Sequence, residues 1–298
     1  MVSFRFSMGS HHSTASLRAS SEASLYSCWP MASKAVLSVM MPIFNEERTL
    51  EIILRHVLEQ PAVGQVIAVD DGSTDHTWEI LRRIADSDQR VHALRQEGNQ
   101  GKGAALRRAV AELQMPFAVV QDADLEYDPR DYPRLLEPLQ EGRADAVYGT
   151  RGFAGQTAFS FWFVVGNKLV TLVTNVLFDC YISDMETGYK VIRSDLWRRL
   201  SLKGRRFDIE PDITARILRL GYRIHEVPIH YYARGREEGK KLTWHDGVRA
   251  LVSLLRLRIS SDRQLFGPEP DWGYHRERQV ALARQHPLVV GNGNPSKP

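Results

Sequence analysis

Two aspartates that are separated by one residue, Asp122 and Asp124, follow the short apolar run Phe117–Val120. Alternate residues of a strand point to the same side, so a strand that ends here would present both carboxylates together. Such oxygen ligands suit Mg²⁺ or Mn²⁺ held partly by the phosphates of a substrate. Glu126 adds a third carboxylate two residues further on. The same residues could instead form an acidic turn that caps a helix starting near Asp131.

Two other polar segments follow apolar runs in the first half of the chain. Residues 44–46 (Phe-Asn-Glu) come shortly after the run 36–41, and Asp71 comes shortly after the run 66–69. Ligands of parallel sheets bind beyond the carboxyl ends of the strands, so these segments are expected to meet the Asp122 turn at one edge. An ionised Asp71 can only accept hydrogen bonds, which would allow it to bind an N–H of a nucleobase. Its segment could equally serve as a helix cap.

The elements that position these residues alternate between short strands and helices. Strands are predicted at 36–41, 66–69, 91–94, 117–121, 144–148 and 223–232. Helices are predicted at 45–58, 77–85, 101–113 and 207–220, with an amphipathic stretch over 243–259. Pro42 is expected to end the first strand, and Asn45 to cap the helix after it. This alternation favours an α/β fold, with a Rossmann-like, mostly parallel sheet flanked by helices on both faces.

The overall composition is that of a globular protein. The 298 residues suffice for one large α/β domain, and a net charge of +3 does not call for a nucleic-acid partner. The two cysteines lack metal-ligand spacing, which makes a reducing, cytoplasmic setting the default. The longest apolar run, 159–178, is interrupted by the polar residues Asn167, Lys168 and Asn175 and is not expected to span a bilayer.

Changes in composition suggest where the catalytic domain begins and ends. Residues 1–33 are rich in Ser, Ala and His and lack the apolar stretch of a secretory signal, so they are expected to form a disordered arm. A single domain is expected over 34–260. Residues 261–298 are rich in Pro, Gly and Arg and are expected to form a loosely ordered tail.

A glycine-rich segment at 98–103 contains Lys102. Its spacing is too short for a P-loop, and Gly103 stands where a serine or threonine would bind Mg²⁺. A helix that starts here could still bring its N-terminus and Lys102 close to an anion. A simple turn before a helix is the alternative.

Four segments occur in an order that is informative: 42–46, 69–75, 99–105 and 122–126. Together they resemble the nucleotide-sugar core of family 2 glycosyltransferases with a GT-A fold. The segments 148–151, 184–190, 226–229 and 234–247 are similar to the branch that contains dolichyl-phosphate mannose synthase and bacterial polyprenyl-phosphate sugar synthases. The resemblance covers roughly residues 35–258.

The resemblance implies a donor site. The residues that would surround the base and ribose of the nucleotide-sugar are Pro42, Phe44, Glu46 and Asp71. Those that would hold the metal ion and diphosphate are Asp122 and Asp124, with Ala123 between them and Glu126 completing the metal shell. Glu126 stands where related synthases often have glutamine. Further donor contacts are implied for Lys102 and for a basic loop containing Arg234, Lys240 and Lys241.

The resemblance also implies an acceptor site and an inverting transfer of a hexose from a donor of the UDP-glucose or GDP-mannose type. Arg151 would hold the phosphate of a polyprenyl acceptor, with Asn167 and Lys168 in place of a second arginine that some synthases have. A phosphate acceptor is largely ionised at neutral pH, so positioning and electrostatics would suffice for catalysis. An alcohol acceptor would need a carboxylate base, for which Asp184 and Glu186 are the candidates unless they have a structural role.

Other readings of the function stay open. The same fold could serve a soluble alcohol or a small phosphorylated acceptor, or form a non-catalytic subunit that binds sugar nucleotides. Residues 244–259 carry apolar side chains at helical spacing together with arginines, which suits peripheral contact with the inner face of the membrane. That stripe could instead pack on the domain.

Overall fold

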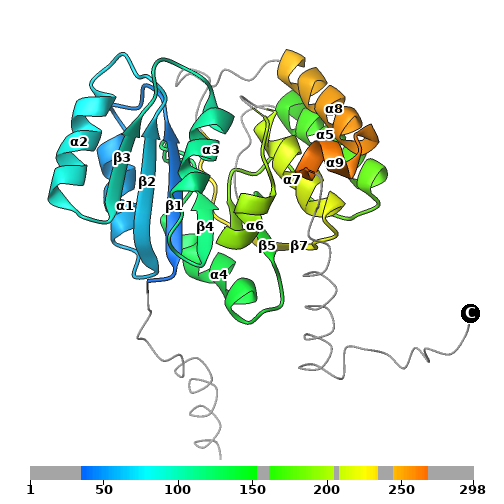
Figure 1. Cartoon of the computed structure of the whole chain (residues 1–298), viewed down its shortest axis with the longest axis horizontal. Coiled ribbons are helices and arrows are strands. Elements are labelled where there is room, and N and C mark those ends of the chain that lie inside the picture. The colour runs from blue at the N-terminus through cyan, green and yellow to red at the C-terminus, as the bar shows by residue number, and fades with distance from the viewer. Residues whose placement is uncertain (1–34, 153–160, 205–207, 234–243, 268–298) are drawn as a thin grey trace, which may run out of the picture. The chain divides into compact units, whose positions relative to one another are not determined.

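Seven strands form one sheet in the order β3-β2-β1-β4-β6-β5-β7 in the computed structural model (Figure 1). The structure describes residues 35–152, 161–204, 208–233 and 244–267. The strands are β1 (Leu37–Ile43), β2 (Val63–Asp70), β3 (Val91–Arg95), β4 (Phe117–Val120), β5 (Ala146–Thr150), β6 (Lys190–Arg193) and β7 (Ile224–Pro228). Strands β1 to β4 pair in parallel, β6 is antiparallel to both β4 and β5, and β7 is parallel to β5.

Helices cover both faces of the sheet, as the alternating pattern predicts. The apolar residues of β1 alternate between the faces: Leu37, Val39 and Met41 belong to one buried cluster and Met40 to the other. The first face packs against α1 (Leu50–Leu58), α2 (Thr77–Ser87) and α4 (Tyr132–Gln140). The second packs against α3 (Lys102–Ala111), α6 (Ser194–Arg199) and α7 (Ile209–Arg219). The predicted α/β class with a mostly parallel sheet is therefore confirmed.

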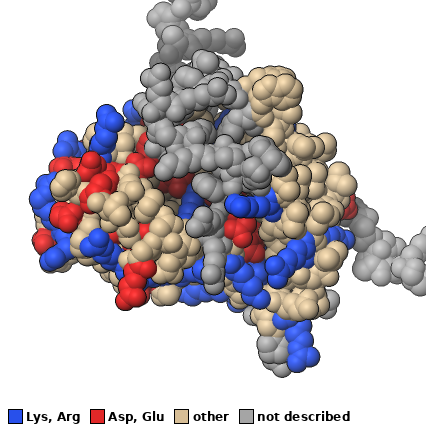
Figure 2. All heavy atoms as spheres, turned by 90° about the horizontal axis from the view of Figure 1, so that it is seen from above, with Lys and Arg blue, Asp and Glu red and all other residues tan. Residues whose placement is uncertain are grey.

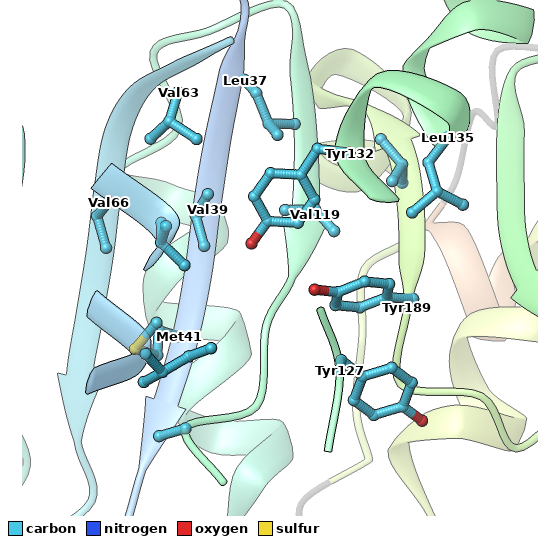
Figure 3. Close-up of a cluster of buried hydrophobic side chains, with 14 of the residues drawn as sticks. Leu37, Val39, Met41, Val63, Val66, Val119, Tyr127, Tyr132, Leu135 and Tyr189 are labelled. Atoms are coloured by element: carbon cyan, nitrogen blue, oxygen red, sulfur yellow. The ribbon is translucent and has the colours of Figure 1, made fainter. Parts of the chain in front are cut away.

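Three tyrosine rings continue the first cluster beyond the aliphatic residues (Figure 3). The ring of Tyr189 lies 4.6 Å from that of Tyr127 and 5.8 Å from that of Tyr132, measured between centroids. The hydroxyls of Tyr189 and Tyr132 both donate to Gln121 Oε1 at 2.6 Å. These bonds satisfy polar groups that burial would otherwise destabilise, and they fix the residue directly before Asp122.

A third buried cluster lies where α5 (Phe161–Phe178), α8 (Trp244–Ile259) and α9 (Asp262–Phe266) meet α7. Helix α9 was not expected, because it falls in the stretch predicted to be a loose tail. Ser261 caps it in a capping box, Leu265 is buried, and Arg216 donates to the carbonyl of Leu265 at 2.7 Å. The ordered domain therefore continues past the predicted boundary at 260, at least to Gly267. The predicted N-terminal arm lies outside the described residues.

Two local predictions were wrong. Pro42 does not end β1 but pairs within it opposite Val69, because β4 pairs with β1 only as far as Met40 and Pro42 lies beyond the end of that neighbour. Asn45 does not cap α1, which begins at Leu50. None of the helices in the described ranges is long and apolar enough to cross a membrane.

Candidate functional site

The polar segments that follow β1, β2 and β4 lie side by side, because these three strands are adjacent and parallel. The first two are interlocked by hydrogen bonds. Asn45 has a left-handed φ of 56°, and its Oδ1 accepts from the amide of Thr74 at 2.9 Å. In return, the amide of Asn45 donates to Ser73 Oγ and that of Glu46 to Thr77 Oγ1, both at 2.9 Å. Asn45 thus joins two loops rather than starting a helix.

The side chains predicted to surround a base differ in whether they are exposed to a ligand or already engaged within the protein. The ring of Phe44 is 37% exposed at the end of β1, so it is free to stack on a planar ligand. Glu46 Oε2 accepts from the hydroxyl of Thr49 at 2.8 Å. Pro42 lies within β1, where its main role is in the sheet.

Asp71 is buried and organises the glycine-rich loop. Its carboxylate accepts from Gln96 Nε2 at 2.6 Å and from the amides of Gln100 and Gly101 at 2.8 and 2.7 Å. A carboxylate has about four lone-pair sites, so one is left for a ligand. Gly72 lies so close to this loop that a Cβ would stand 2.5 Å from Gly98 Cα. The role predicted for Asp71 in base recognition therefore stays a prediction, with a structural role beside it.

Lys102 begins α3 and bridges two carboxylates. Its Nζ lies 2.8 Å from Asp122 Oδ1 and 3.2 Å from Glu210 Oε1. Burial acts to lower the pKa of Lys102, but the charges of Asp122 and Glu210 outweigh it and raise that pKa above its usual range. Lys102 was predicted to contact the nucleotide-sugar donor. In this arrangement it holds Asp122 directly.

Asp122, Asp124 and Glu126 were predicted to form a metal shell. No group of three or more His, Cys, Asp or Glu side chains within the described ranges is placed to hold a metal ion. Glu126 is buried, and its Oε2 accepts from the hydroxyl of Tyr231 at 2.7 Å. Leu125 has a left-handed φ of 63°, and Asp124 Oδ1 accepts from the amide of Glu126 at 3.2 Å. Completion of the shell by Glu126 therefore stays a prediction, with the hydrogen bond to Tyr231 as a structural role beside it.

The remaining pair still suits a divalent ion. Mg²⁺ is commonly bound by one or two carboxylates together with substrate phosphates, rather than by a cage made of protein alone. Asp124 is half-buried, and Asp122 shares its charge with Lys102. Their hard oxygens at the end of β4 fit a metal that arrives with a diphosphate.

The predicted acceptor residues meet beyond the end of β5. Arg151 donates from Nε and Nη2 to the two oxygens of Asp184, both at 2.8 Å, and both side chains are largely buried. Asn167 Nδ2 reaches Asp184 Oδ1 at 3.4 Å, and Lys168 Nζ donates to the carbonyl of Ser183 at 2.9 Å. The structure thus brings together the three residues that were assigned to an acceptor phosphate.

Asp184 is unsuited to the role of general base that the sequence left open for it. Burial acts to raise the pKa of Asp184, but its hydrogen bonds with Arg151 and the charge of that guanidinium outweigh burial and lower the pKa. A carboxylate engaged in this way is a weak proton acceptor. Asp184 instead orients the guanidinium of Arg151.

Glu186 differs from Asp184. Its Oε1 is buried and has no hydrogen-bond partner within the part of the chain that the structure describes. Burial and the nearby charge of Glu210 raise the pKa of Glu186 to about 7. Of the two carboxylates considered as bases, Glu186 is the one with the suitable proton affinity.

This pKa predicts a pH-dependent effect of Glu186→Gln on stability. Between the ordinary value of 4.5 and about 7 the folded protein binds more protons at this site than the unfolded chain, so stability falls as pH rises through that window. Glutamine does not titrate. We expect the free energy of unfolding of the variant, relative to the wild type, to rise by about 1–3 kcal/mol from pH 5 to pH 8. Urea unfolding at the two pH values measures it.

The exposed Glu137 on α4 provides a control for that experiment. Glu137→Gln should shift stability equally at both pH values, within the experimental error. An equal shift for Glu186→Gln would contradict the raised pKa.

Several residues of the site were not predicted. Glu210 at the start of α7 accepts from the buried Lys190, which also donates to the carbonyls of Met185 and Thr187. Tyr231 links Glu126 to the acceptor side, since its ring lies 5.2 Å from the guanidinium carbon of Arg151. The predicted helix over 207–220 contained a signal for Glu210, an acidic residue in a first turn, but nothing local indicated its partner. The predicted basic loop with Arg234, Lys240 and Lys241 lies outside the described residues.

Comparison with known proteins gives the same family as the sequence motifs suggest. Residues 38–199 match the model of glycosyl transferase family 2. The polyprenol monophosphomannose synthase of Mycolicibacterium smegmatis is 31% identical over 212 residues, which are 66% of this chain and 77% of that protein. The undecaprenyl-phosphate mannosyltransferase of Micrococcus luteus is 29% identical over 211 residues, 67% of this chain and 85% of that protein.

A solved structure shows the same fold. Glucosyl-3-phosphoglycerate synthase from Mycobacterium tuberculosis, solved with Mn²⁺, UDP and glucosyl-3-phosphoglycerate, superposes with a TM-score of 0.57 at 23% identity, over 76% of this chain and 81% of that chain. The family match includes the Asp122/Asp124 turn, Arg151 and the Asp184 segment. The chain therefore belongs to glycosyl transferase family 2 and is a glycosyltransferase, with polyprenyl-phosphate mannosyltransferases among its relatives.

Proposed function

We propose that this enzyme transfers a hexose, with inversion, from a nucleotide-sugar of the UDP-glucose or GDP-mannose type to a polyprenyl phosphate. The observation that carries the proposal is the contact of Tyr231 with both halves of the site. Its hydroxyl donates to Glu126, two residues from Asp124, and its ring lies against the guanidinium of Arg151. An anion bound to Arg151 would therefore lie near the tyrosine whose hydroxyl holds Glu126, the residue two positions after Asp124.

The donor side would bind the diphosphate. Asp124 and Asp122 would hold Mg²⁺ or Mn²⁺, which supplies positive charge to the leaving nucleoside diphosphate. Phe44 would stack on the base, and the free lone pair of Asp71 would accept from it. The M. tuberculosis synthase, of similar fold, was solved with Mn²⁺ and UDP, and with Mg²⁺ and UDP.

The acceptor side would bind a phosphate monoester. Arg151 has five N–H donors, of which Asp184 takes two with short bonds, so an edge of the guanidinium remains for phosphate oxygens. A phosphate oxygen would attack the anomeric carbon from the face opposite the diphosphate, whose C–O bond breaks. The phosphate is already ionised at neutral pH, so no protein base is required, in keeping with the engagement of Asp184.

A small phosphorylated acceptor is the second candidate. Arg151, Asn167 and Lys168 would bind a phosphate in the same way whatever molecule carried it. The M. tuberculosis synthase was also solved with phosphoglyceric acid, although the likeness to it concerns the fold alone.

A panel of acceptors tests the proposal. The purified protein is incubated with UDP-glucose or GDP-mannose, Mn²⁺, and either a polyprenyl phosphate, the matching polyprenol, or 3-phosphoglycerate. We expect product with the polyprenyl phosphate and none with the polyprenol. Product with 3-phosphoglycerate alone would overturn the lipid assignment in favour of the second candidate.

Arg151→Lys is expected to weaken acceptor binding selectively. Lysine keeps the charge but cannot bind Asp184 and a phosphate through a planar fork. Loss of one such charged hydrogen bond costs about 1.5–3 kcal/mol, so the KM for the acceptor should rise roughly tenfold or more while that for the donor stays unchanged. Steady-state kinetics with each substrate varied in turn measures this split.

Arg193 offers a matched control for that variant. It also forms ion pairs, with Asp145 and Asp195, but it lies at the opposite end of the sheet from Asp124. Arg193→Lys should leave both KM values unchanged. Equal changes in the two KM values of Arg151→Lys would argue against an acceptor role.

A further inference from the structure

Helix α5 presents a stripe of apolar side chains to solvent. The exposed large apolar residues on it are Phe161, Trp162, Val165, Leu169, Leu172 and Val176. Apart from Trp162 their spacings are three and four residues, so they share one face of the helix. Trp162 is 77% exposed and Val176 73%. A helix that is apolar on nearly all sides is normally buried, so this face requires a partner.

Helix α8 packs beside α5 and adds a second stripe. Ala250, Leu254 and Leu257 of α8 are buried in the cluster that includes Val170 of α5. The exposed apolar residues of α8 are Val248, Val252, Leu255 and Ile259. Leu251 of α8 packs against the cluster. We call the two stripes together the α5/α8 face.

Basic side chains flank the α5/α8 face. Arg249 and Arg256 are exposed on one side of the α8 stripe and Arg258 on the other, and Lys168 is the one charged residue in the sequence of α5. Figure 2 shows a mostly uncharged area on the side of the molecule that carries α5 and α8 in Figure 1, with charged side chains, most of them lysine and arginine, at its borders. An apolar stripe between basic residues complements a surface of anionic lipid.

Another side of α5 contacts the segment that carries Asp184. The side chain of Asn175 forms two hydrogen bonds with the backbone of Ile182. Its Oδ1 accepts from the amide at 3.0 Å, and its Nδ2 donates to the carbonyl at 2.9 Å. The amide of Met185 donates to Thr171 Oγ1 at 3.2 Å. Between them, the amides of Ser183 and Asp184 donate to the carboxylate of Glu226 on β7. Four consecutive amides are thus held by side chains, two of them from α5.

We infer that the α5/α8 face binds the surface of an anionic lipid bilayer, and that this contact activates transfer by stabilising the 182–185 segment through α5. The same helix contacts the lipid on one side and, through Thr171 and Asn175, positions the residues that hold Asp184 against Arg151. Stabilising α5 would order the acceptor arginine even when the acceptor itself is dissolved in water. The activation rests on the proposed function, whereas the binding of the bilayer does not.

Vesicles test the surface without reference to any substrate. The full chain is sedimented with vesicles of phosphatidylglycerol or of phosphatidylcholine. We expect binding to the anionic vesicles, and a fall of at least about tenfold for the double variant Leu169→Glu/Val252→Glu, because each charge opposes both burial and the negative lipid. Ile52→Glu, at an exposed apolar site on α1, should bind like the wild type. Equal binding of the two variants, or no binding at all, would overturn the assignment of this face.

Hydrogen exchange tests the coupling through α5. We expect the amides of 182–185 to exchange about threefold more slowly, or slower still, when anionic vesicles are bound. Asn175→Ala combined with Thr171→Val should still bind vesicles but lose this protection. Protection that persists in that variant would contradict transmission through α5. The oligomeric state without vesicles is a further check. A wild type that is a dimer, together with a Leu169→Glu/Val252→Glu variant that is a monomer, would assign the face to a second copy of the chain instead of a bilayer.

Turnover measurements test whether the bound bilayer activates transfer. With a short, water-soluble polyprenyl phosphate, anionic vesicles should raise the turnover number several-fold in the wild type, and not in the Asn175/Thr171 variant. Turnover that is unaffected by bound vesicles would overturn the activation. A protein that binds vesicles and protects 182–185 but transfers sugar to no polyprenyl phosphate would leave the surface in place and refute the proposed function alone.

Discussion

Asp124→Ala is expected to lower sugar transfer by on the order of 10²-fold or more, because it removes a carboxylate that would hold the metal. The positive charge of that metal would stabilise the leaving diphosphate. The fold should survive. Asp124 is half-buried, and its contacts include a 3.2 Å hydrogen bond from the amide of Glu126. Transfer from a radiolabelled donor measures the activity, and circular dichroism measures the folding.

Asp86 on α2 is the control for this variant. It is exposed, and Asp86→Ala removes the same charge far from the end of β4. Its activity should equal that of the wild type. A turnover number for Asp124→Ala that lies within a few-fold of that for Asp86→Ala would contradict the metal-binding role assigned to the acidic turn.

The repeat of strands and helices could be predicted because it depends on local patterns. Runs such as 66–69 are apolar throughout, as expected for strands covered on both faces, and all of β2 except one residue proved buried. Strand β6 was missed since it has four residues with a charged residue at each end. Its place in the sheet depends on pairing with β4 and β5, which no local pattern contains.

The site residues could be predicted by type but not by partner. Asp122 and Asp124 were identified from their spacing at a strand end. The ammonium of Lys102, however, comes from a helix 20 residues earlier, and Asp184 meets Arg151 across 33 residues. These pairs decide which carboxylate carries charge, so the sequence could not choose between Asp184 and Glu186 as a base.

For helix α5, the sequence did not predict which face of the helix stays exposed. From its apolar composition the sequence predicts only that this run is too interrupted to span a membrane. The interruptions themselves proved informative, since Asn167, Lys168 and Asn175 contact the 182–185 segment. Which side of an apolar helix stays exposed depends on tertiary packing, and this became visible only once α8 was seen beside α5.

Glu210→Ala is expected to destabilise the protein by about 3–5 kcal/mol, the range found when one partner of a buried ion pair is removed. Glu210 lies between two ammonium groups, Lys102 and the fully buried Lys190. Without it, Lys190 keeps two carbonyl partners and the face of the Tyr148 ring at 4.8 Å, but it has no bonded carboxylate among the residues that the structure describes. Urea unfolding measures the loss, with the exposed Glu137→Ala as the control.

The pH dependence identifies the cause of that loss. Burial lowers the pKa of Lys190, and the charge of Glu210 opposes burial, so removing Glu210 should lower this pKa further. A depressed lysine pKa means that the unfolded chain binds more protons than the folded protein below the ordinary value of 10.5, so stability rises with pH up to that value. The deficit of Glu210→Ala should therefore shrink between pH 7 and pH 10. A deficit that is the same at both pH values would mean that lost packing, rather than the uncompensated charge of Lys190, destabilises the variant.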